Sequence, residues 1–203
     1  MPIALLSGFD CWGGSAVNTS WAAVEAAAPS LAPGWTVRKV MLPVSWTRGP
    51  VELAAAWSAD VGAVIACGMA DITAIHVEQI AINLTGPGLA DVDGLPPPSP
   101  WVIPDGPPAY FSGLPVTSLC EAMLKSHIPA VKSPHCGTYL CDFIFYWLMH
   151  KIHSERLGIP GGFLHIPSPA SRLDPATLAR GVAIATELSV ARAPSGQCEK
   201  NPL

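Results

Sequence analysis

The sequence predicts an α/β fold, with one domain over residues 1–203 built as a three-layer α/β/α sandwich around a mixed, mostly parallel sheet. Short apolar runs alternate with segments whose apolar side chains recur at helical spacing, a pattern typical of βαβ units. Residues 61–67, Val-Gly-Ala-Val-Ile-Ala-Cys, are almost continuously apolar, as strands covered on both faces are. A chain of 203 residues that is 50% hydrophobic can also bury one sizeable core.

The N-terminal half supplies three predicted strands and two predicted helices. The apolar run at residues 3–7 is followed by a capped helical segment at 17–27. Residues 35–43 form the second predicted strand, and residues 50–58 form the next helix because their apolar side chains share one face. The buried strand at 61–67 closes this alternation.

A loop bounded by glycines, residues 8–14, lies between the first strand and the first helix. Open α/β sheets bind ligands in loops at the carboxyl ends of their strands. Neither glycine pattern of phosphate-binding loops is present, whereas Phe9 and Trp12 suit the walls of an apolar pocket. Ordinary packing of the two aromatic rings explains the local sequence equally well.

The middle of the chain contains one unusual carboxylate and one unusual connection. Glu78 lies in a strand-like segment in which Ile80 and Ile82 share its parity, so it is either exposed at an edge or held in a site. The local sequence alone favours exposure. Residues 86–108 are so rich in Pro and Gly that no regular element is expected there, and a lid or a subunit contact fits such a length.

The C-terminal half repeats the alternation of strands and helices. In its last predicted helix Asp174 is the capping residue and Pro175 takes the first helical position. His165 lies near the carboxyl end of the last strand, and the chain from Ala193 onward is expected to be frayed. Besides the segment around Cys141, the predicted elements are helices at 114–126 and 174–190 and strands at 128–132 and 161–167.

The segment at residues 133–153 carries the first candidate nucleophile. Gly137 breaks the chain and Thr138 is a good N-cap, so a helix is predicted to begin near Thr138, with a buried face formed by Ile144, Phe145, Leu148 and Ile152. Cys141 then lies in the first turn, where unpaired N–H groups and the helix dipole favour a thiolate. A small buried core residue is the alternative, because free cysteines are commonly buried.

Composition excludes several classes of function. The net charge of −4 and the lack of a basic run argue against a nucleic-acid partner. No apolar segment approaches the roughly 20 residues that cross a bilayer, and residues 1–6 read as a strand rather than a signal peptide, so a cytoplasmic protein is expected. The six cysteines are expected to be reduced. His135, Cys136 and Cys141 are close in sequence but form no four-ligand set, so neither a metal nor a cofactor is expected.

Cys141, His165 and Glu78 together provide the three groups that cysteine-dependent acyl transfer requires. The sulfur is the nucleophile, the imidazole holds and delivers its proton, and the carboxylate orients the imidazole. Sequence spacing does not show that the three meet. Each has a structural explanation of its own, and other histidines are available at positions 76, 135, 150 and 153.

Four motifs in order resemble those of the pyroglutamyl-peptidase I (pyrrolidone-carboxylate peptidase) family. They are Leu-Leu-Ser-Gly-Phe-Asp-Cys-Trp-Gly-Gly-Ser-Ala-Val-Asn-Thr-Ser-Trp at 5–21, Glu-Gln-Ile-Ala-Ile-Asn at 78–83, Gly-Thr-Tyr-Leu-Cys-Asp at 137–142 and Gly-Phe-Leu-His-Ile-Pro at 162–167. The resemblance implies an α/β/α enzyme that hydrolyses the amide after an N-terminal pyroglutamyl group. It implies Cys141 as nucleophile, His165 as base and then acid, and Glu78 as orienting carboxylate. The residues that it places around the substrate are Phe9, Trp12, Met69, Leu89, Tyr139 and Leu140. A homo-oligomer is a further expectation, because family members are often oligomeric.

The chain departs from the family pattern at positions that bear on the substrate. Met69 stands where the family has a glutamine, and Pro-Gly-Leu-Ala-Asp at 87–91 replaces Ala-Arg-Ile-Pro-Asp, whose arginine is placed near the oxyanion. Losing one such donor typically costs about 10²–10³ in rate. Asp142 replaces an asparagine, and its carboxylate would disfavour a thiolate at Cys141 if it pointed inward.

Three functions are therefore carried forward. The first is cysteine-dependent hydrolysis of an amide next to a small neutral acyl group such as N-terminal pyroglutamate. The second applies the same three residues to another small amide, lactam or acyl-transfer substrate, as Met69 suggests. The third is a binding or scaffold protein that retains the fold without catalysis. An apolar slot would in each case select a neutral ring or acyl group, because burying an unpaired ammonium is costly.

Overall fold

A single mixed sheet forms the middle layer of the computed structural model, which describes residues 1–86, 88 and 90–194. The described residues form seven strands, whose order is β2-β1-β3-β7-β4-β5, with β6 also paired to β4. β1, β2, β3 and β7 run parallel to one another, β6 runs parallel to β4, and β4 is antiparallel to β7 and β5. The strand bounds are β1 (Ile3–Phe9), β2 (Thr36–Leu42), β3 (Val61–Ala70), β4 (Ile75–Ile82), β5 (Ala109–Phe111), β6 (Ala130–His135) and β7 (Gly161–Pro167).

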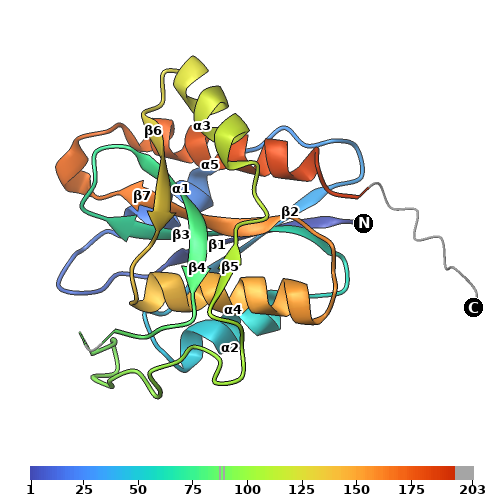
Figure 1. Cartoon of the computed structure of the whole chain (residues 1–203). Helices are drawn as coiled ribbons and strands as arrows, with labels where there is room; N and C mark the ends of the chain where they lie inside the picture. The colour runs from blue at the N-terminus through green and yellow to red at the C-terminus, as the bar shows by residue number, and fades with distance from the viewer. Residues whose placement is uncertain (87, 89, 195–203) are drawn as a thin grey trace, which may run out of the picture.

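Helices cover both faces of this sheet, which confirms the predicted α/β fold class (Figure 1). α1, α3 and α5 pack on one face around a core that includes Leu6, Ile65 and Leu164. α4 and α2 pack on the other face, where Phe145 and Phe163 are fully buried. The helix bounds are α1 (Thr19–Ala26), α2 (Arg48–Ala56), α3 (Val116–Lys125), α4 (Leu140–Ser154) and α5 (Pro175–Val190), and a short 3₁₀ helix, η1, covers Pro169–Ser171.

The observed strand ends differ from the predicted ones in two instructive places. β3 was predicted to end at Cys67, but it continues to Ala70 because Gly68, Met69 and Ala70 pair with β7. β5 was not predicted at all, since it has three residues and pairs with β4 only through Ile80 to Ile82.

The helix that carries Cys141 begins two residues later than predicted. Tyr139 is its N-cap, and no side chain caps it, so the assignment of Thr138 as N-cap was wrong. Gly137 has a φ of 89°, which turns the chain, and the carbonyl of Thr138 instead accepts a hydrogen bond from the N–H of Gly86 at 2.9 Å. Cys141 is nevertheless in the first turn of α4. Asp174 is the N-cap of α5 with Pro175 following, although its side chain makes no capping bond.

The described part of residues 86–108 contains no helix or strand, and local hydrogen bonds organise it. Asp91 is its central residue: one carboxylate oxygen accepts bonds from the N–H groups of Asp93 and Leu95, both at 2.9 Å, and the other accepts from the N–H of Trp46 at 3.0 Å. The prediction of a frayed tail from Ala193 onward falls, beyond Pro194, outside the described residues.

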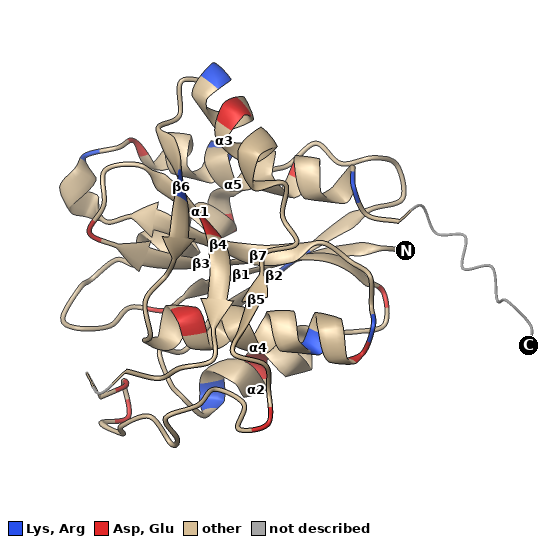
Figure 2. Cartoon of the chain, viewed as in Figure 1, with Lys and Arg blue, Asp and Glu red and all other residues tan. Residues whose placement is uncertain are grey.

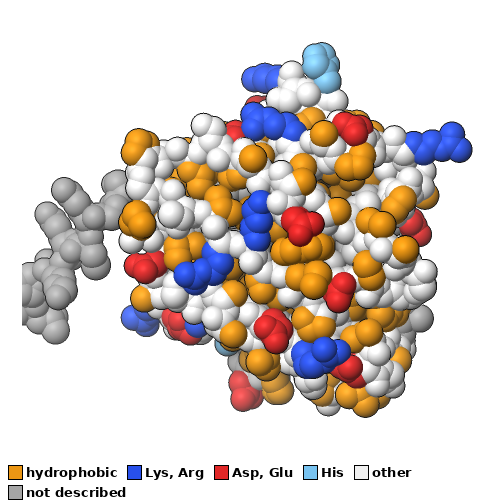
Figure 3. Space-filling model, turned by 180° about the vertical axis from the view of Figure 1, so that it is seen from behind, with side chains coloured by type: hydrophobic (Ala, Val, Ile, Leu, Met, Phe, Trp, Pro, Cys, Tyr) orange, Lys and Arg blue, Asp and Glu red, His pale blue; other side chains and the backbone are white. Residues whose placement is uncertain are grey.

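Charged side chains are sparse and dispersed over the surface. Figure 2 shows Lys and Arg positions on several elements of both helical layers. On the face seen from behind, hydrophobic side chains alternate with charges of both signs (Figure 3). No helix among the described residues is long and apolar enough to span a membrane.

Candidate active site

His165 and Glu78 meet inside the sheet, on neighbouring antiparallel strands. His165 is in β7 and faces His76 of β4 in register, which brings Glu78, two residues further along β4, to its side. Its Nδ1 lies 2.8 Å from Oε1 of Glu78. The glutamate is 0% exposed and the histidine 8% exposed, so the expectation from local sequence that Glu78 is exposed was wrong.

The sulfur of Cys141 reaches the same histidine from the start of α4. Burial by itself would lower the pKa of His165, but a negative sulfur at Cys141 and its hydrogen bond, together with Glu78, outweigh burial and raise that pKa to about 10. Because Nδ1 faces Glu78, Nε2 is the ring nitrogen left for Cys141. A cysteine sulfur held against an imidazole is the arrangement in which cysteine nucleophiles are activated.

Gly68 makes room for this sulfur at the end of β3. A Cβ atom at position 68 would lie 2.7 Å from Sγ of Cys141 and 2.8 Å from the ring of Phe163. Gly68 is also the register partner of His165 across the β3–β7 pair. The backbone of β3 therefore lies directly under the Cys141 sulfur and beside His165.

A second buried carboxyl group lies next to Cys141. Asp142 is 0% exposed, and its Oδ1 accepts hydrogen bonds from the N–H of Ile82 at 3.1 Å and from the thiol of Cys136 at 3.7 Å. Burial raises the pKa of the Asp142 carboxyl to about 7, against the lowering effect of these two bonds. The side chain therefore points inward, which is the orientation in which its carboxylate would disfavour a thiolate at Cys141.

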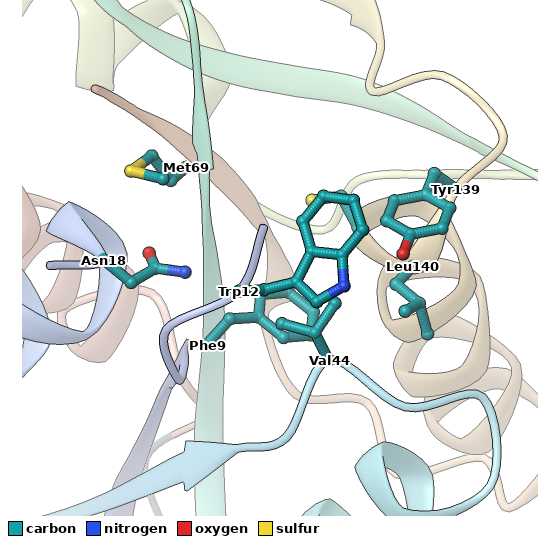
Figure 4. Close-up of a pocket in the computed structure, with 8 residues that line it drawn as sticks. Phe9, Trp12, Asn18, Val44, Met69, Tyr139 and Leu140 are labelled. Atoms are coloured by element: carbon teal, nitrogen blue, oxygen red, sulfur yellow. The ribbon is translucent and has the colours of Figure 1, made fainter. Parts of the chain in front are cut away.

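A small, mostly apolar cavity of about 120 Å³ opens beside Cys141 (Figure 4). Trp12 and Tyr139 form part of its wall, with ring centroids 5.5 Å apart, and Trp46 packs edge-on against Tyr139 at 5.2 Å. The volume is well below the roughly 300 Å³ at which drug-sized ligand sites begin, so it fits a small acyl group. It is lined by Phe9, Trp12, Asn18, Val44, Met69, Tyr139, Leu140 and Cys141.

Five of the six residues expected around the substrate thus lie around one cavity, and the sixth, Leu89, is outside the described residues. The sequence analysis missed Asn18 and Val44. Asn18 caps α1 through the N–H of Ser20, its Nδ2 donates to the carbonyl of Asp10 at 2.9 Å, and Figure 4 shows this amide directed toward the cavity. The sequence placed it only within a capped helical segment, and its place in the wall depends on how the loop at residues 8–14 folds.

Three of the remaining histidines lie in other surroundings. Burial lowers the pKa of His76, the neighbour of Glu78 on β4. His150 Nδ1 lies 3.0 Å from the hydroxyl of Tyr110, and His153 stacks on the same ring. Within the described residues, no three His, Cys, Asp or Glu side chains gather as a metal site would require.

Comparison with known proteins gives the same result at three levels. The family model for pyroglutamyl peptidase matches residues 3–190. A pyrrolidone-carboxylate peptidase of Clavibacter michiganensis is 38% identical over 169 residues, covering 82% of this chain and 79% of the relative, and one of Bacillus licheniformis is 34% identical, covering 91% of each.

Solved structures agree with these sequence matches. The crystal structure of Bacillus amyloliquefaciens pyroglutamyl peptidase I superposes with a TM-score of 0.87 at 30% identity, over 94% of this chain and 98% of that one. The pyrrolidone carboxyl peptidase of Thermococcus litoralis gives a TM-score of 0.87 at 26% identity, over 94% of each chain. With a family model that spans nearly its whole length and relatives above 30% identity, this chain belongs to the pyroglutamyl peptidase family.

Proposed function

We propose that Cys141, His165 and Glu78 form the catalytic triad of this cysteine peptidase, and that it removes N-terminal pyroglutamate from peptides. The observation that carries the assignment is the 2.8 Å contact between Nδ1 of His165 and Oε1 of Glu78, on an imidazole that also binds the Cys141 sulfur. Relatives of the same length are named for this activity. A nucleophile, a base and an orienting acid are the three parts that acyl transfer to sulfur requires.

The reaction follows from this geometry in two halves. His165 accepts the thiol proton through Nε2, and the sulfur attacks the carbonyl carbon to give a tetrahedral oxyanion. His165 then donates that proton to the leaving amine as the C–N bond breaks, which leaves a thioester on Cys141. A water that loses its proton to His165 attacks the thioester, the C–S bond breaks, and the acid product leaves with the thiol restored.

Backbone N–H groups are our candidates for holding the oxyanion. The first intrahelical bond of α4 runs from the N–H of Phe143 to the carbonyl of Tyr139, so the N–H groups of Leu140, Cys141 and Asp142 precede it. No arginine occurs in the sequence between Arg48 and Arg156. The start of α4 therefore supplies the positive end of a helix dipole where a side-chain cation is missing.

The cavity supports a small neutral acyl group as the substrate. Its lining combines aromatic rings and aliphatic side chains, and the hydroxyl of Tyr139 is already donated to the carbonyl of Ala90 at 3.0 Å. The amide of Asn18 keeps one N–H beyond its bond to Asp10, and we assign this N–H to the carbonyl oxygen of the bound ring. A charged N-terminal amine would lose its hydration without gaining a partner.

The test is hydrolysis of a pyroglutamyl amide that releases a fluorescent amine. The Cys141→Ser variant should lose at least about 10³-fold in kcat, because a hydroxyl beside this imidazole is a far weaker nucleophile than a thiolate. Cys120→Ser, a change in α3 on the other side of the sheet, is the matched control and should keep the activity. Equal rates for Cys141→Ser and the native chain would rule out the assignment.

One observation favours a second substrate class for the same triad. Met69 lines the cavity and offers a thioether in place of a hydrogen-bonding side chain, so the ring is recognised more by shape than by polar contacts. Amides of cyclopentanecarboxylic acid should then be cleaved within about tenfold of pyroglutamyl amides. Met69→Gln should widen the gap in favour of the lactam, and unchanged discrimination would speak against this class.

We further propose that the chain acts in the cytoplasm and self-associates. The five cysteines among the described residues are free thiols, which suits a reducing compartment.

Phe111 is 76% exposed on the edge strand β5, a surface that a second copy can cover. Light scattering on the native chain and on Phe111→Ser tests the second point, since a monomer in both would remove it.

A further inference from the structure

Asp142 is a buried carboxyl group that the proposed mechanism does not use. Asp142 is fully buried, and its Oδ1 accepts a hydrogen bond from the N–H of Ile82 at 3.1 Å. This bond links the first turn of α4 to β4. Its second oxygen, Oδ2, has no hydrogen-bond partner among the described residues. An ionised carboxylate in such a place would leave one charged oxygen bare, and a buried charge without a partner is costly.

Most of the titratable groups around Asp142 are acidic. Glu78 faces it from β4, and Oε2 of that glutamate also lacks a partner within the described part of the chain. The thiol of Cys136 lies after β6, Cys141 is its neighbour on α4, and Tyr146 is one turn further along the same helix. His165 on β7 is the basic group whose charge acts on Asp142. That imidazole already serves Glu78 and Cys141.

We propose that Asp142 is a positioning residue that works in its neutral form, holding the first turn of α4 on β4 without placing a second carboxylate charge beside the nucleophile. This inference rests on the triad assigned above. A neutral carboxyl keeps the acceptor for Ile82 and has the shape of an amide, so the contact survives while the charge does not. Burial, which raises the pKa of this carboxyl to about 7, keeps the neutral form populated on the acid side of neutrality.

Ionisation of Asp142 should harm catalysis for an electrostatic reason. Negative charge develops on the substrate oxygen as the sulfur attacks, and the start of α4 is where we place the donors for it. A carboxylate in that same turn opposes the charge. The bare oxygen would also tend to move toward water and carry the first turn with it.

The test compares the pH profile of kcat/KM for the native chain and for Asp142→Asn, whose amide is neutral at every pH. At about pH 6 the two should agree within about twofold, since Asp142 is then mostly protonated. At about pH 8, one unit above its pKa, only about one-tenth of the native chain holds a neutral Asp142, so Asp142→Asn should be about tenfold faster. Asp60→Asn, an exposed change at the opposite end of β3, is the matched control and should follow the native profile.

Two further measurements separate positioning from folding and from failure of the triad itself. Asp142→Ala loses the acceptor for Ile82, so it should be slow at every pH while remaining folded by circular dichroism. Infrared spectra should contain a protonated carboxylic acid band at about pH 6 that is absent from Asp142→Asn, and this readout needs no activity. The proposal fails if Asp142→Asn has the native profile, if it is inactive at every pH while the native chain is active, or if the band is missing.

Discussion

His165 is the residue on which the charges of the site depend. Its burial opposes a positive charge, while the two acidic partners on either side of the ring favour it, and the acidic partners prevail. Of these, Cys141 has the larger effect and Glu78 the smaller. The charge of the imidazole is therefore a property of the assembled site, and it should respond to each partner in that order.

We predict that Cys141→Ala lowers the pKa of His165 from about 10, because burial is then opposed by Glu78 alone. Glu78→Gln should lower it by less. The measurement is a proton NMR titration of the imidazole Cε1–H resonance, with the exposed His127 ring as an internal reference. A His165 resonance that titrates identically in the native chain and Cys141→Ala would contradict the ion pair.

We predict that Glu78→Gln lowers kcat by about 10² or more and leaves KM within about threefold, because the carboxylate orients His165 and stabilises its charge without touching the substrate. Glu121→Gln, on the exposed side of α3, is the control. Steady-state kinetics on a pyroglutamyl amide measures both constants. A raised KM with native kcat would instead place Glu78 in substrate binding.

At this scale the sequence motifs singled out Cys141, His165 and Glu78, which the structure brings together, but they did not reveal the environment of these residues. Glu78 was expected to be exposed because a strand sequence does not reveal which strands will flank it, and the partners β6 and β7 come more than 45 residues later. Asn18 was recognised only as part of a helix start. Its place in the cavity wall depends on tertiary packing, which local pattern does not encode.

Among the elements, the end of β3 sets the position of the Cys141 sulfur. We predict that Gly68→Ala lowers kcat by about 10² or more, because the new methyl group competes with the Cys141 sulfur for one space 2.7 Å away. The rate of alkylation of Cys141 by iodoacetamide, followed by mass spectrometry, should fall with it.

Gly62→Ala provides the control for damage to the strand alone. Its methyl group would lie 2.6 Å from the ring of Trp35, near the start of the same strand, so it should lower stability and spare kcat. If Gly68→Ala and Gly62→Ala have the same kcat, the clash with the sulfur is not the cause of lost activity.

The loop at residues 86–108 supports the cavity through Asp91. We predict that Asp91→Ala raises KM by about tenfold and changes kcat less, because Trp46 loses the acceptor that fixes it and Tyr139 loses the wall it packs on. Arg48→Ala is the control, since it removes an exposed pair with Asp93 that is worth little. A change in kcat alone would show that the loop does not shape the cavity.

Elements with strong apolar periodicity were predicted well and their ends less so. The buried faces of α4 and β3 came directly from the sequence. Gly68 was taken as a strand end because glycine commonly breaks strands, whereas here it continues β3 and leaves space for a sulfur. Thr138 was taken as a cap because threonine is a good N-cap residue. Nothing in the sequence shows that its carbonyl is bonded to Gly86.

The whole molecule places its cavity where the strand order changes direction. β1 lies between β2 and β3 in the sheet. Phe9 and Met69, which line the cavity, lie at the carboxyl ends of β1 and β3. A crevice at this point is the general binding place of open α/β sheets. β7 then brings His165 from the next strand along, and the reversed β4 adds Glu78 from beyond it.

The pH dependence of stability should show the cost of assembling this site. Asp142 ordinarily has a pKa of 3.8 and in the folded chain one of about 7, so between these values the folded state binds more protons than the unfolded state. Where the folded state holds extra protons, stability falls as pH rises.

We therefore predict that Asp142 makes the free energy of unfolding decline from about pH 4 to about pH 7, by at most about 1.4 kcal/mol per pH unit. Asp142→Asn should remove this contribution. Urea unfolding of both chains across this range measures the effect, and a native stability that rises from pH 4 to 7 relative to Asp142→Asn would mean that Asp142 is ionised in the folded chain.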